Sequence, residues 1–448
     1  MTVNRDTKII DLSPMDAVMA NIGVTILLIY APSETHHYDM DILKKSFVET
    51  LDRDYQVLLG ELISDSKRHG MPCVKLDTVT LSEGGSAVPF AVSSACHETT
   101  EEALESLSYD FMPPARKGKH QLIAVKCSVL SDGGLVLGLD FAHGVLDGEA
   151  AFTFAQVWGQ YYRKFSGISV LENPIKLNHD RSLLAAKADQ ASLPHPEFQV
   201  LPPGTSSASE IELVGPLPVP AMDGTLSTSQ RMLHLSPNQL SRLKTLVSDV
   251  PNSSYVSTID SLSALLTVLI TRARGHGQDV RIATCVNGRE HLKPPLPANY
   301  VGNVIFNAVT TYQAAELASD SSATFNDTLG VVARRIRSSI KKTRDDHFLR
   351  DSLAFISSQQ DMTSVFVSTN FIFGHDIFFT SWVRMGAYDA DFGGGKPHYA
   401  GLPRVPVTDG LVVIADPMYP AKDGLDVIVL LETGTMKRFS EQWEELAL

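Results

Sequence analysis

Cysteine is scarce in this chain, and the few cysteines present do not pair in sequence. Only four occur among 448 residues, namely Cys73, Cys96, Cys127 and Cys285, and no two of them have CxxC spacing. Disulfide frameworks and zinc clusters need denser cysteine, so we expect free thiols, a reducing compartment and no metal site. Cys285 falls in a predicted buried strand, where we expect an inert core thiol.

A long apolar run and an excess of positive charge are also missing. The first residues are too polar for a signal peptide, and the apolar run VTILLIY (residues 24–30) has the length of a strand and not of a membrane span. The net charge of -13 argues against general binding to nucleic acid or to an anionic membrane. We therefore expect a soluble, cytoplasmic protein that binds neither nucleic acid nor membrane.

What the chain does contain is a mixture of predicted strands and helices in its first half. Residues 23–31 are rich in β-branched residues and predict a buried strand. Residues 40–62 have apolar positions at helical spacing and predict one amphipathic helix. Two apolar segments flank Asp132-Gly133-Gly134 and predict a hairpin, and residues 149–167 predict a helix that ends at a glycine.

A change of composition divides the chain. Residues 186–228 are dense in proline, serine and glycine and predict a crossover linker, which separates an N-terminal domain (1–185) from a C-terminal domain (229–448). The C-terminal part predicts a helix over 257–275, where Ser257 and Asp260 have capping-box spacing, and a basic helix over 324–348. Further strands are predicted at 231–236, 280–287, 364–371, 410–418 and 425–432. The expected fold class is α/β or α+β in two domains.

The stretch DFAHGVLDGEA (residues 140–150) puts a histidine where a strand ends and a helix is about to begin. Histidine is the natural general base near neutral pH, and His143 stands in a turn that a rigid support can display. Asp147 has two open roles. It either orients the ring of His143, or it is structural and caps the helix or pairs with an arginine. In isolation, this motif would favour a core histidine in a turn.

Three other motifs stand beside it in the chain. They are LSPMD (residues 12–16), VNGREHLKPPLPANYVGNVIF (286–306) and TSWVRMGAYDADFGGGKP (380–397). Together with HGVLDG (143–148) they resemble the BAHD acyltransferases, the acyl-CoA-dependent family marked by HxxxD and DFGWG. The resemblance extends over nearly the whole chain, with the motifs in the family's order.

This resemblance implies a fold and an activity. The fold is two domains like chloramphenicol acetyltransferase, with mixed sheets flanked by helices and an active-site channel between them. The acyl donor enters the channel from one face and the acceptor from the other. The implied activity is transfer of an acyl group, with acetyl expected, from acyl-CoA to a hydroxyl of a small secondary metabolite. CoA is then a co-substrate and not a permanent cofactor, and the enzyme is expected to be a monomer.

The resemblance also implies roles for individual residues. His143 matches the catalytic base, and Thr380 and Trp382 match donors that lie near the reacting carbonyl. Asp147 belongs to the catalytic motif, but the family pattern makes it the structural partner of an arginine, here Arg289. Gly148 is expected to permit the turn or close backbone packing.

The DFGGG segment departs from the family pattern. Asp391, Gly393 and Gly395 match the motif and are expected to be structural, whereas Gly394 stands where the family usually has tryptophan. In the family this motif lies away from the chemistry and shapes the channel and its CoA side. The departure therefore concerns donor placement rather than the base.

Two features are candidates for binding CoA. Ser257 matches a region that is often near CoA in the family, although a plain helix cap explains it equally well. The densest basic run comprises Arg334, Arg335, Arg337, Lys341, Lys342 and Arg344. A solvated helix face is favoured for this run over a phosphate site.

Two other functions stay open. Condensation-type domains, which use carrier-bound donors, carry HHxxxDG, and Ala142 at the first position counts against that function. A non-catalytic binding protein of the same fold is the other alternative, and the presence of His143, Thr380 and Trp382 argues against it.

Overall fold

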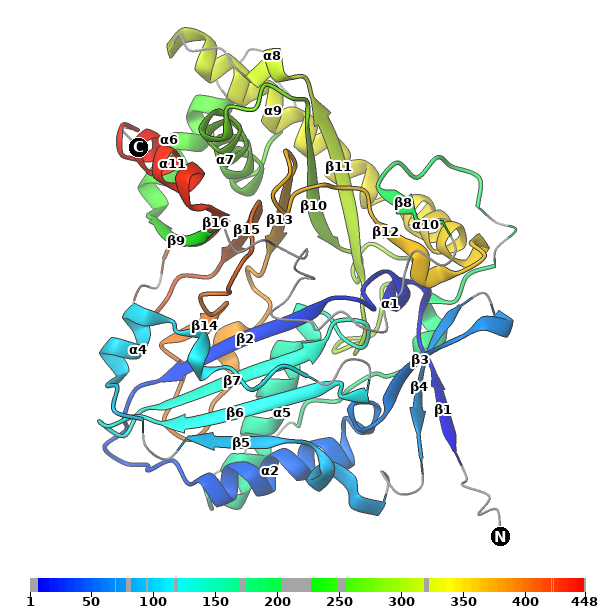
Figure 1. Ribbon diagram of the computed structural model, residues 1–448, viewed down its shortest axis with the longest axis vertical. Helices are drawn as coiled ribbons and strands as arrows, with labels where there is room; N and C mark the ends of the chain where they lie inside the picture. Colours follow the sequence, from blue (N-terminus) through cyan, green and yellow to red (C-terminus); the bar gives the residue numbers. More distant parts are fainter. Residues whose placement is uncertain are drawn as a thin grey trace.

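Two large sheets organise the molecule (Figure 1). The computed structural model describes residues 7–68, 70–77, 82–93, 96–116, 120–168, 174–187, 189, 191–202, 227–248, 255–317, 322–419, 421 and 423–446. A five-stranded sheet has the order β14-β2-β7-β6-β5, and a six-stranded sheet has the order β11-β10-β13-β15-β16-β9. Both are mixed sheets flanked by helices, so the α/β class expected from the sequence is confirmed.

The five-stranded sheet is built around two wholly buried strands. These are β2 (Gly23–Tyr30) and β7 (Leu135–Ala142), which pair antiparallel. β6 (Ile123–Val129) forms the predicted hairpin with β7, and β5 (Phe90–Ser93) runs parallel to β6. Helices α2 (Met40–Arg53) and α5 (Gly148–Phe165) cover one face (Figure 1). Their aromatic rings Phe47, Phe154 and Trp158 pack edge-on and make the centre of this core.

The six-stranded sheet carries its own helical layer. Its strands are β9 (Thr228–Leu235), β10 (Val280–Asn287), β11 (Ile305–Tyr312), β13 (Ile377–Ser381), β15 (Leu411–Ala415) and β16 (Leu425–Glu432). Its helices are α6 (Pro237–Ser248), α7 (Thr258–Arg274), α9 (Ser322–Thr343) and α11 (Thr433–Glu444). The predicted capping box of α7 is present, and a second hydrophobic core lies between α7, α9 and the sheet.

Short strands connect the two halves of the chain. β14 (Tyr399–Gly401) leaves the C-terminal half and pairs with β2 at the edge of the N-terminal sheet. β8 (Phe198–Val200), which lies within the predicted crossover, pairs with β12 (Val365–Val367). Residues 203–226 of that crossover lie outside the described residues.

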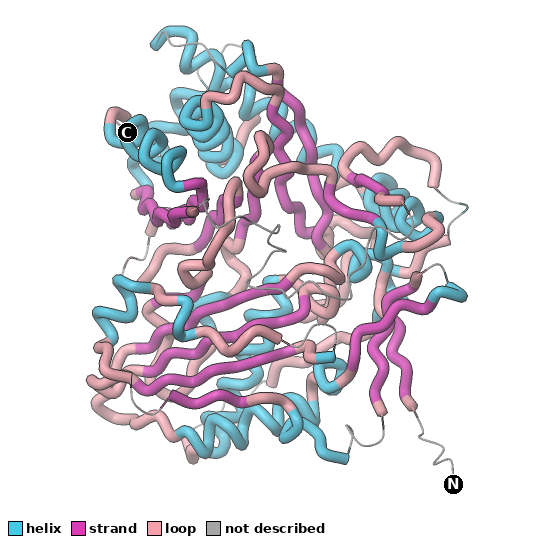
Figure 2. The backbone as a smooth tube through the Cα atoms, in the orientation of Figure 1, coloured by secondary structure: helices cyan, strands magenta, loops and turns pink. Residues whose placement is uncertain are grey.

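Smaller elements complete the fold. A three-stranded sheet combines β1 (Lys8–Asp11), β4 (Met71–Leu76) and β3 (Glu61–Asp65) beside the N-terminus (Figure 2). The short helices are α1 (Pro14–Val18), α4 (Thr100–Ser106) and α8 (Ala314–Leu317), and α10 (Asp346–Ser358) is longer.

Two predicted helices have the wrong extent. The helix expected over 40–62 ends at Arg53, and β3 starts at Glu61. Gly60 precedes β3 directly, and a Cβ there would lie 2.4 Å from Val74 Cγ1 and 2.6 Å from the Lys75 carbonyl oxygen, so the chain enters β3 tightly against β4. The basic helix expected over 324–348 stops at Thr343, since Asp345 caps a new helix, α10.

Candidate active site

His143 lies in the turn between β7 and α5. The strand ends at Ala142, and the His143 N–H donates to the Ile22 carbonyl at 2.9 Å, which ties the turn to the start of β2. Four residues later Asp147 caps α5 by accepting from the Ala150 N–H. A buried strand and a capped helix therefore hold the turn from both sides.

The ring of His143 is oriented by an amide. His143 Nδ1 lies 2.8 Å from Asn303 Oδ1. Asn303 Nδ2 donates to the His143 carbonyl at 2.6 Å and to Asp16 Oδ1 at 2.7 Å. Because both of those partners are acceptors, the amide oxygen must face the ring, and Nδ1 must carry the proton. Nε2 is thus left as the basic nitrogen, and no described residue hydrogen-bonds to it.

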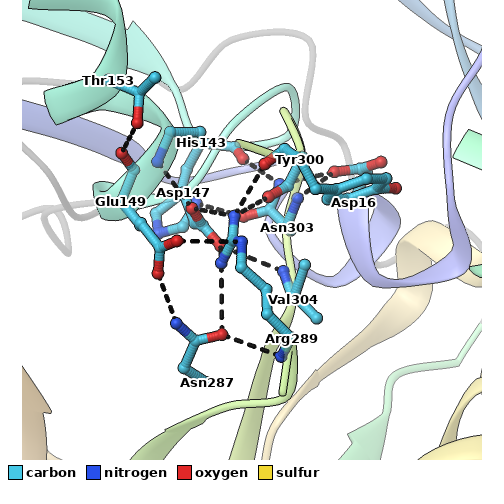
Figure 3. Close-up of polar contacts among 12 residues, drawn as sticks. Asp16, His143, Asp147, Glu149, Thr153, Asn287, Arg289, Tyr300, Asn303 and Val304 are labelled. Carbon is cyan, nitrogen blue, oxygen red and sulfur yellow. Dashed lines mark hydrogen bonds and ion pairs between the residues drawn. The ribbon is translucent and has the colours of Figure 1, made fainter. Parts of the chain in front are cut away.

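Asp16 fixes Asn303 in turn. Its side chain accepts from the Asn303 backbone N–H at 3.0 Å, and it closes a capping box with Ser13 at the start of α1. Asp16 is fully buried. The LSPMD motif therefore contributes a carboxylate that positions the residue beside the histidine (Figure 3).

Asp147 points away from His143 and binds Arg289. Two parallel hydrogen bonds of 2.8 and 2.9 Å join the guanidinium to the two carboxylate oxygens. The Ala150 and Val304 N–H groups occupy the remaining acceptor positions at 3.1 Å each. Arg289 also donates to the carbonyls of Tyr300 and Gly302. Asp147 thus pairs with Arg289, and among the described residues no hydrogen bond joins its carboxylate to the imidazole (Figure 3).

Burial and neighbouring charges shift both titratable groups. Burial lowers the pKa of His143, and the negative charge of Asp147 and the hydrogen bond to Asn303 offset this only in part. Burial alone would raise the pKa of Asp147, but Arg289 outweighs it and holds that pKa below its ordinary value. The site therefore contains a neutral imidazole beside an ionised carboxylate at neutral pH.

A cavity of about 360 Å³ opens beside the histidine. His143, Gly148, Thr380 and Trp382 all line it, so the structure brings together these four sequence-predicted residues. Thr380 lies on β13 next to β15, and the Trp382 ring packs edge-on against Phe152 at 5.4 Å between centroids. Cys285 also lines the cavity and is partly exposed to it, and burial raises the pKa of its thiol to about 12.

Gly148 needs no special backbone conformation. It is not among the glycines with positive φ, and an added Cβ would lie 3.6 Å from Trp382 Nε1, which is an ordinary contact. Neither a turn requirement nor close packing within the protein accounts for this glycine. Its effect is to leave space in the cavity.

The remaining predicted residues lie elsewhere. Ser257 caps α7 and accepts from Arg337 Nη2 at 2.6 Å, so its hydroxyl is engaged by the protein itself. Asp391 accepts from the N–H groups of Gly393 and Gly395 and pairs with Arg163 of α5 at 3.0 Å. Neither Ser257 nor Asp391 is among the described residues that line the cavity.

The basic run does not form one free surface. Arg335 pairs with Glu316 and Arg337 with Asp260, whereas Lys341 and Arg344 are exposed.

Within the described residues no group of three metal-ligating side chains occurs, and no described helix is long and apolar enough to cross a membrane.

Sequence reasoning missed two residues of the site. Asp16 lies in the LSPMD motif and Asn303 in the motif at residues 286–306, and 287 residues separate the two side chains in the sequence. A Ser13–Asp16 pair with capping-box spacing at the start of a short helix and an asparagine between Gly302 and Val304 were the available signals. Neither indicates a contact with His143 until the two halves of the chain are placed side by side.

Comparison with known proteins identifies the class. A family model described as the Transferase family matches residues 4–446. A hydroxycinnamoyltransferase of Narcissus pseudonarcissus is 30% identical over 329 residues, which span 72% of this chain and 70% of the relative. A shikimate O-hydroxycinnamoyltransferase of Nicotiana tabacum is 27% identical over 326 residues, spanning 72% and 69%. This chain is thus an acyl-CoA-dependent acyltransferase, and it belongs to the BAHD family.

A solved structure supports the fold independently. F. graminearum TRI101 complexed with coenzyme A and deoxynivalenol matches with a TM-score of 0.74 at 18% identity, over 98% of both chains. At this identity the match shows a shared fold.

Proposed function

We propose that this enzyme transfers an acyl group from acyl-CoA to a hydroxyl of a small metabolite, with His143 as general base. Nε2 takes the proton of the acceptor hydroxyl while that oxygen forms a bond to the thioester carbonyl carbon. The tetrahedral intermediate then breaks its carbon–sulfur bond. The proton passes from Nε2 to the departing CoA thiolate, so the ester and CoA leave and the imidazole is restored without a covalent acyl-enzyme.

The observation that carries this proposal is the hydrogen bond from His143 Nδ1 to Asn303. It leaves Nε2 unprotonated, and the lowered pKa of His143 keeps the ring neutral at physiological pH. Thr380 and Trp382 line the same cavity, and we propose the Thr380 hydroxyl and the Trp382 indole N–H as donors to the oxyanion. One such donor contributes about 10²–10³-fold to the rate in other acyl transfers.

We propose acetyl as the acyl group on the grounds of space. The cavity of about 360 Å³ is near the lower limit of ligand pockets, which span about 300–1,000 Å³. A hydroxycinnamoyl donor is the second candidate, because the daffodil and tobacco relatives are named for that group. The similar proteins also point to different acceptors. The tobacco relative is named for shikimate, and the TRI101 structure contains deoxynivalenol.

Release of free CoA thiol tests the donor and the reaction together. The purified enzyme is incubated with acetyl-CoA, p-coumaroyl-CoA or an acyl carrier protein loaded with acetate, each with a panel of hydroxylated metabolites, and products are identified by mass spectrometry. We expect ester formation from free acetyl-CoA, and none with His143→Ala. Activity only with the carrier-bound donor would support a condensation-type function instead, and acyl-protein trapped by acid quenching would contradict direct transfer.

A further inference from the structure

Hydrocarbon side chains form most of the cavity wall beside His143. Apolar residues come from the segment before β2, from the β8–β12 pair and from the C-terminal sheet; they include Met19, Ile22, Leu201, Phe366, Phe378 and Val413. The side chains with polar groups among the described lining residues are Asn21, Thr25, His143, Gln199, Cys285, Thr369, Thr380 and Trp382. None of them is a lysine, arginine, aspartate or glutamate.

The buried arginines nearby are committed to other groups. Three arginines are buried in the described part of the chain. Arg289 binds Asp147 in two parallel hydrogen bonds, Arg116 binds Asp140 at 2.8 Å, and Arg181 donates to the Val145 carbonyl at 2.7 Å. None of the three lines the cavity.

We infer that the acceptor is a neutral, largely hydrocarbon alcohol and not a hydroxy acid. This inference rests on the proposed function, because it assigns the substrate class of the same cavity. A carboxylate that enters an apolar site loses its hydration, and only a cation or several donors can replace it. The described wall offers a few neutral hydrogen-bonding groups, which suit one or two hydroxyls on a ring or terpenoid skeleton.

Pairs of acceptors that differ only in charge provide the test. Each hydroxy acid in the panel, shikimate included, is assayed with acetyl-CoA beside its own methyl ester, which keeps the reacting hydroxyl and removes the carboxylate. We expect kcat/KM to be at least about 100-fold higher for the esters. Burying an unpaired carboxylate costs free energy, and only a small free-energy difference is needed for each tenfold change in kcat/KM. The same pairs are compared as ligands by the shift they produce in the midpoint of thermal unfolding, which does not depend on turnover.

A single added cation should reverse part of this preference. Gln199 lies on β8, is exposed and borders the cavity, so Gln199→Arg can carry its charge without being buried. We expect this variant to improve the acid-to-ester ratio of kcat/KM by about 10-fold or more. Gln199→Met has similar length without charge and should leave the ratio as in the unmodified enzyme.

The outcomes separate this inference from the proposed function. Acylation of the acids at a rate equal to or above that of their esters, or thermal stabilisation by the acids alone, overturns the neutral acceptor while leaving acyl transfer intact. A His143→Ala enzyme that still acylates the esters at the normal rate instead overturns the general base. A panel that is inert in both assays with every donor counts against the proposed function, and the inference falls with it.

Discussion

Two histidines in this protein, the half-buried His143 and the buried His195, have opposite electrostatic surroundings. His143 Nδ1 meets the neutral amide of Asn303, and its other nitrogen borders the cavity. His195 is hydrogen-bonded at both nitrogens by carboxylates, at 2.6 Å from Glu197 Oε1 and 2.8 Å from Asp351 Oδ1. Its ring lies between Phe348 and Phe355, with centroids 5.2 and 5.1 Å away.

The neighbours decide what each imidazole can do. Burial lowers the pKa of both rings when taken alone, and for His143 this effect prevails. For His195 the two carboxylates outweigh burial, and the pKa is raised above 6.5. A neutral ring with one free nitrogen can exchange a proton, whereas a cation with both N–H groups bound is a structural link. His195 thus connects the segment before β8 to α10.

Exchanging the two histidines for alanine should give opposite phenotypes. His143→Ala should lose at least about 10²–10⁴-fold in kcat/KM, which is the contribution of a positioned base, and keep its unfolding midpoint. His195→Ala leaves Glu197 and Asp351 facing each other and should lose about 3–5 kcal/mol of stability, with near-normal kcat in the folded fraction. Steady-state kinetics and urea unfolding measure both. The comparison fails if His143→Ala is unstable and His195→Ala is merely inactive.

The second prediction concerns Asp147, which is close to His143 in sequence but is hydrogen-bonded to Arg289 and not to the imidazole. Asp147→Ala leaves the buried guanidinium of Arg289 unpaired, so we expect a loss of about 3–5 kcal/mol in unfolding free energy and poor recovery of folded protein. The double variant Asp147→Ala, Arg289→Met removes both charges and should recover part of that stability. A fully stable Asp147→Ala enzyme without activity would mean that the aspartate orients the imidazole after all.

Much of this site could be predicted from sequence, for identifiable reasons. His143 and Asp147 share one turn, and the opposite charges of Asp147 and Arg289 lie in motifs whose spacing resembles a known family. The link from Asp16 through Asn303 to His143 could not be predicted, because it depends on how residues 287 positions apart meet in space. The start of β3 within the predicted helix could not be predicted for the same reason, since it depends on the close approach of Gly60 to β4. His195 lies in a loop, where no periodicity indicates its partners.

The pH dependence of activity should show whether Asn303 acts through His143. The base must be neutral, so kcat/KM should fall as pH drops through the pKa of His143, which lies below the ordinary value of 6.5. The Asn303 hydrogen bond raises that pKa, so Asn303→Ala should move the acidic limb to lower pH. The same variant should lose about 10–100-fold in kcat/KM through misorientation of the ring. A changed rate with an unmoved acidic limb would assign Asn303 a purely structural role.

Stability should depend on pH through His195 in the opposite sense. Because its pKa in the folded protein is above 6.5, its contribution is fully present below pH 6.5 and is lost as pH rises through the raised value. Asp351 has a lowered pKa, so its contribution is present above pH 3.8 and disappears in stronger acid. We expect the unfolding midpoint of the unmodified protein to decline above pH 6.5, and His195→Gln to remove that decline. An identical decline in both proteins would assign it to other groups.

The smallest expected effect concerns Gly394, where the family usually has tryptophan. A Cβ at this position would lie 2.2 Å from Tyr38 Oη, so the tyrosine occupies the space that a side chain would need. Gly394→Ala should therefore lower the free energy of unfolding by about 1–3 kcal/mol through overpacking. Tyr38→Phe should restore part of that loss, because the next tyrosine atom, Cζ, lies 3.1 Å from the added Cβ.

Gly395→Ala is the matched control. Nothing lies within 4 Å of its added Cβ, but its φ of +94° makes any side chain strained, so Tyr38→Phe should not rescue it. Rescue of Gly394→Ala alone, measured in a double-mutant cycle, would show that the Tyr38 hydroxyl occupies the space that a side chain at position 394 needs.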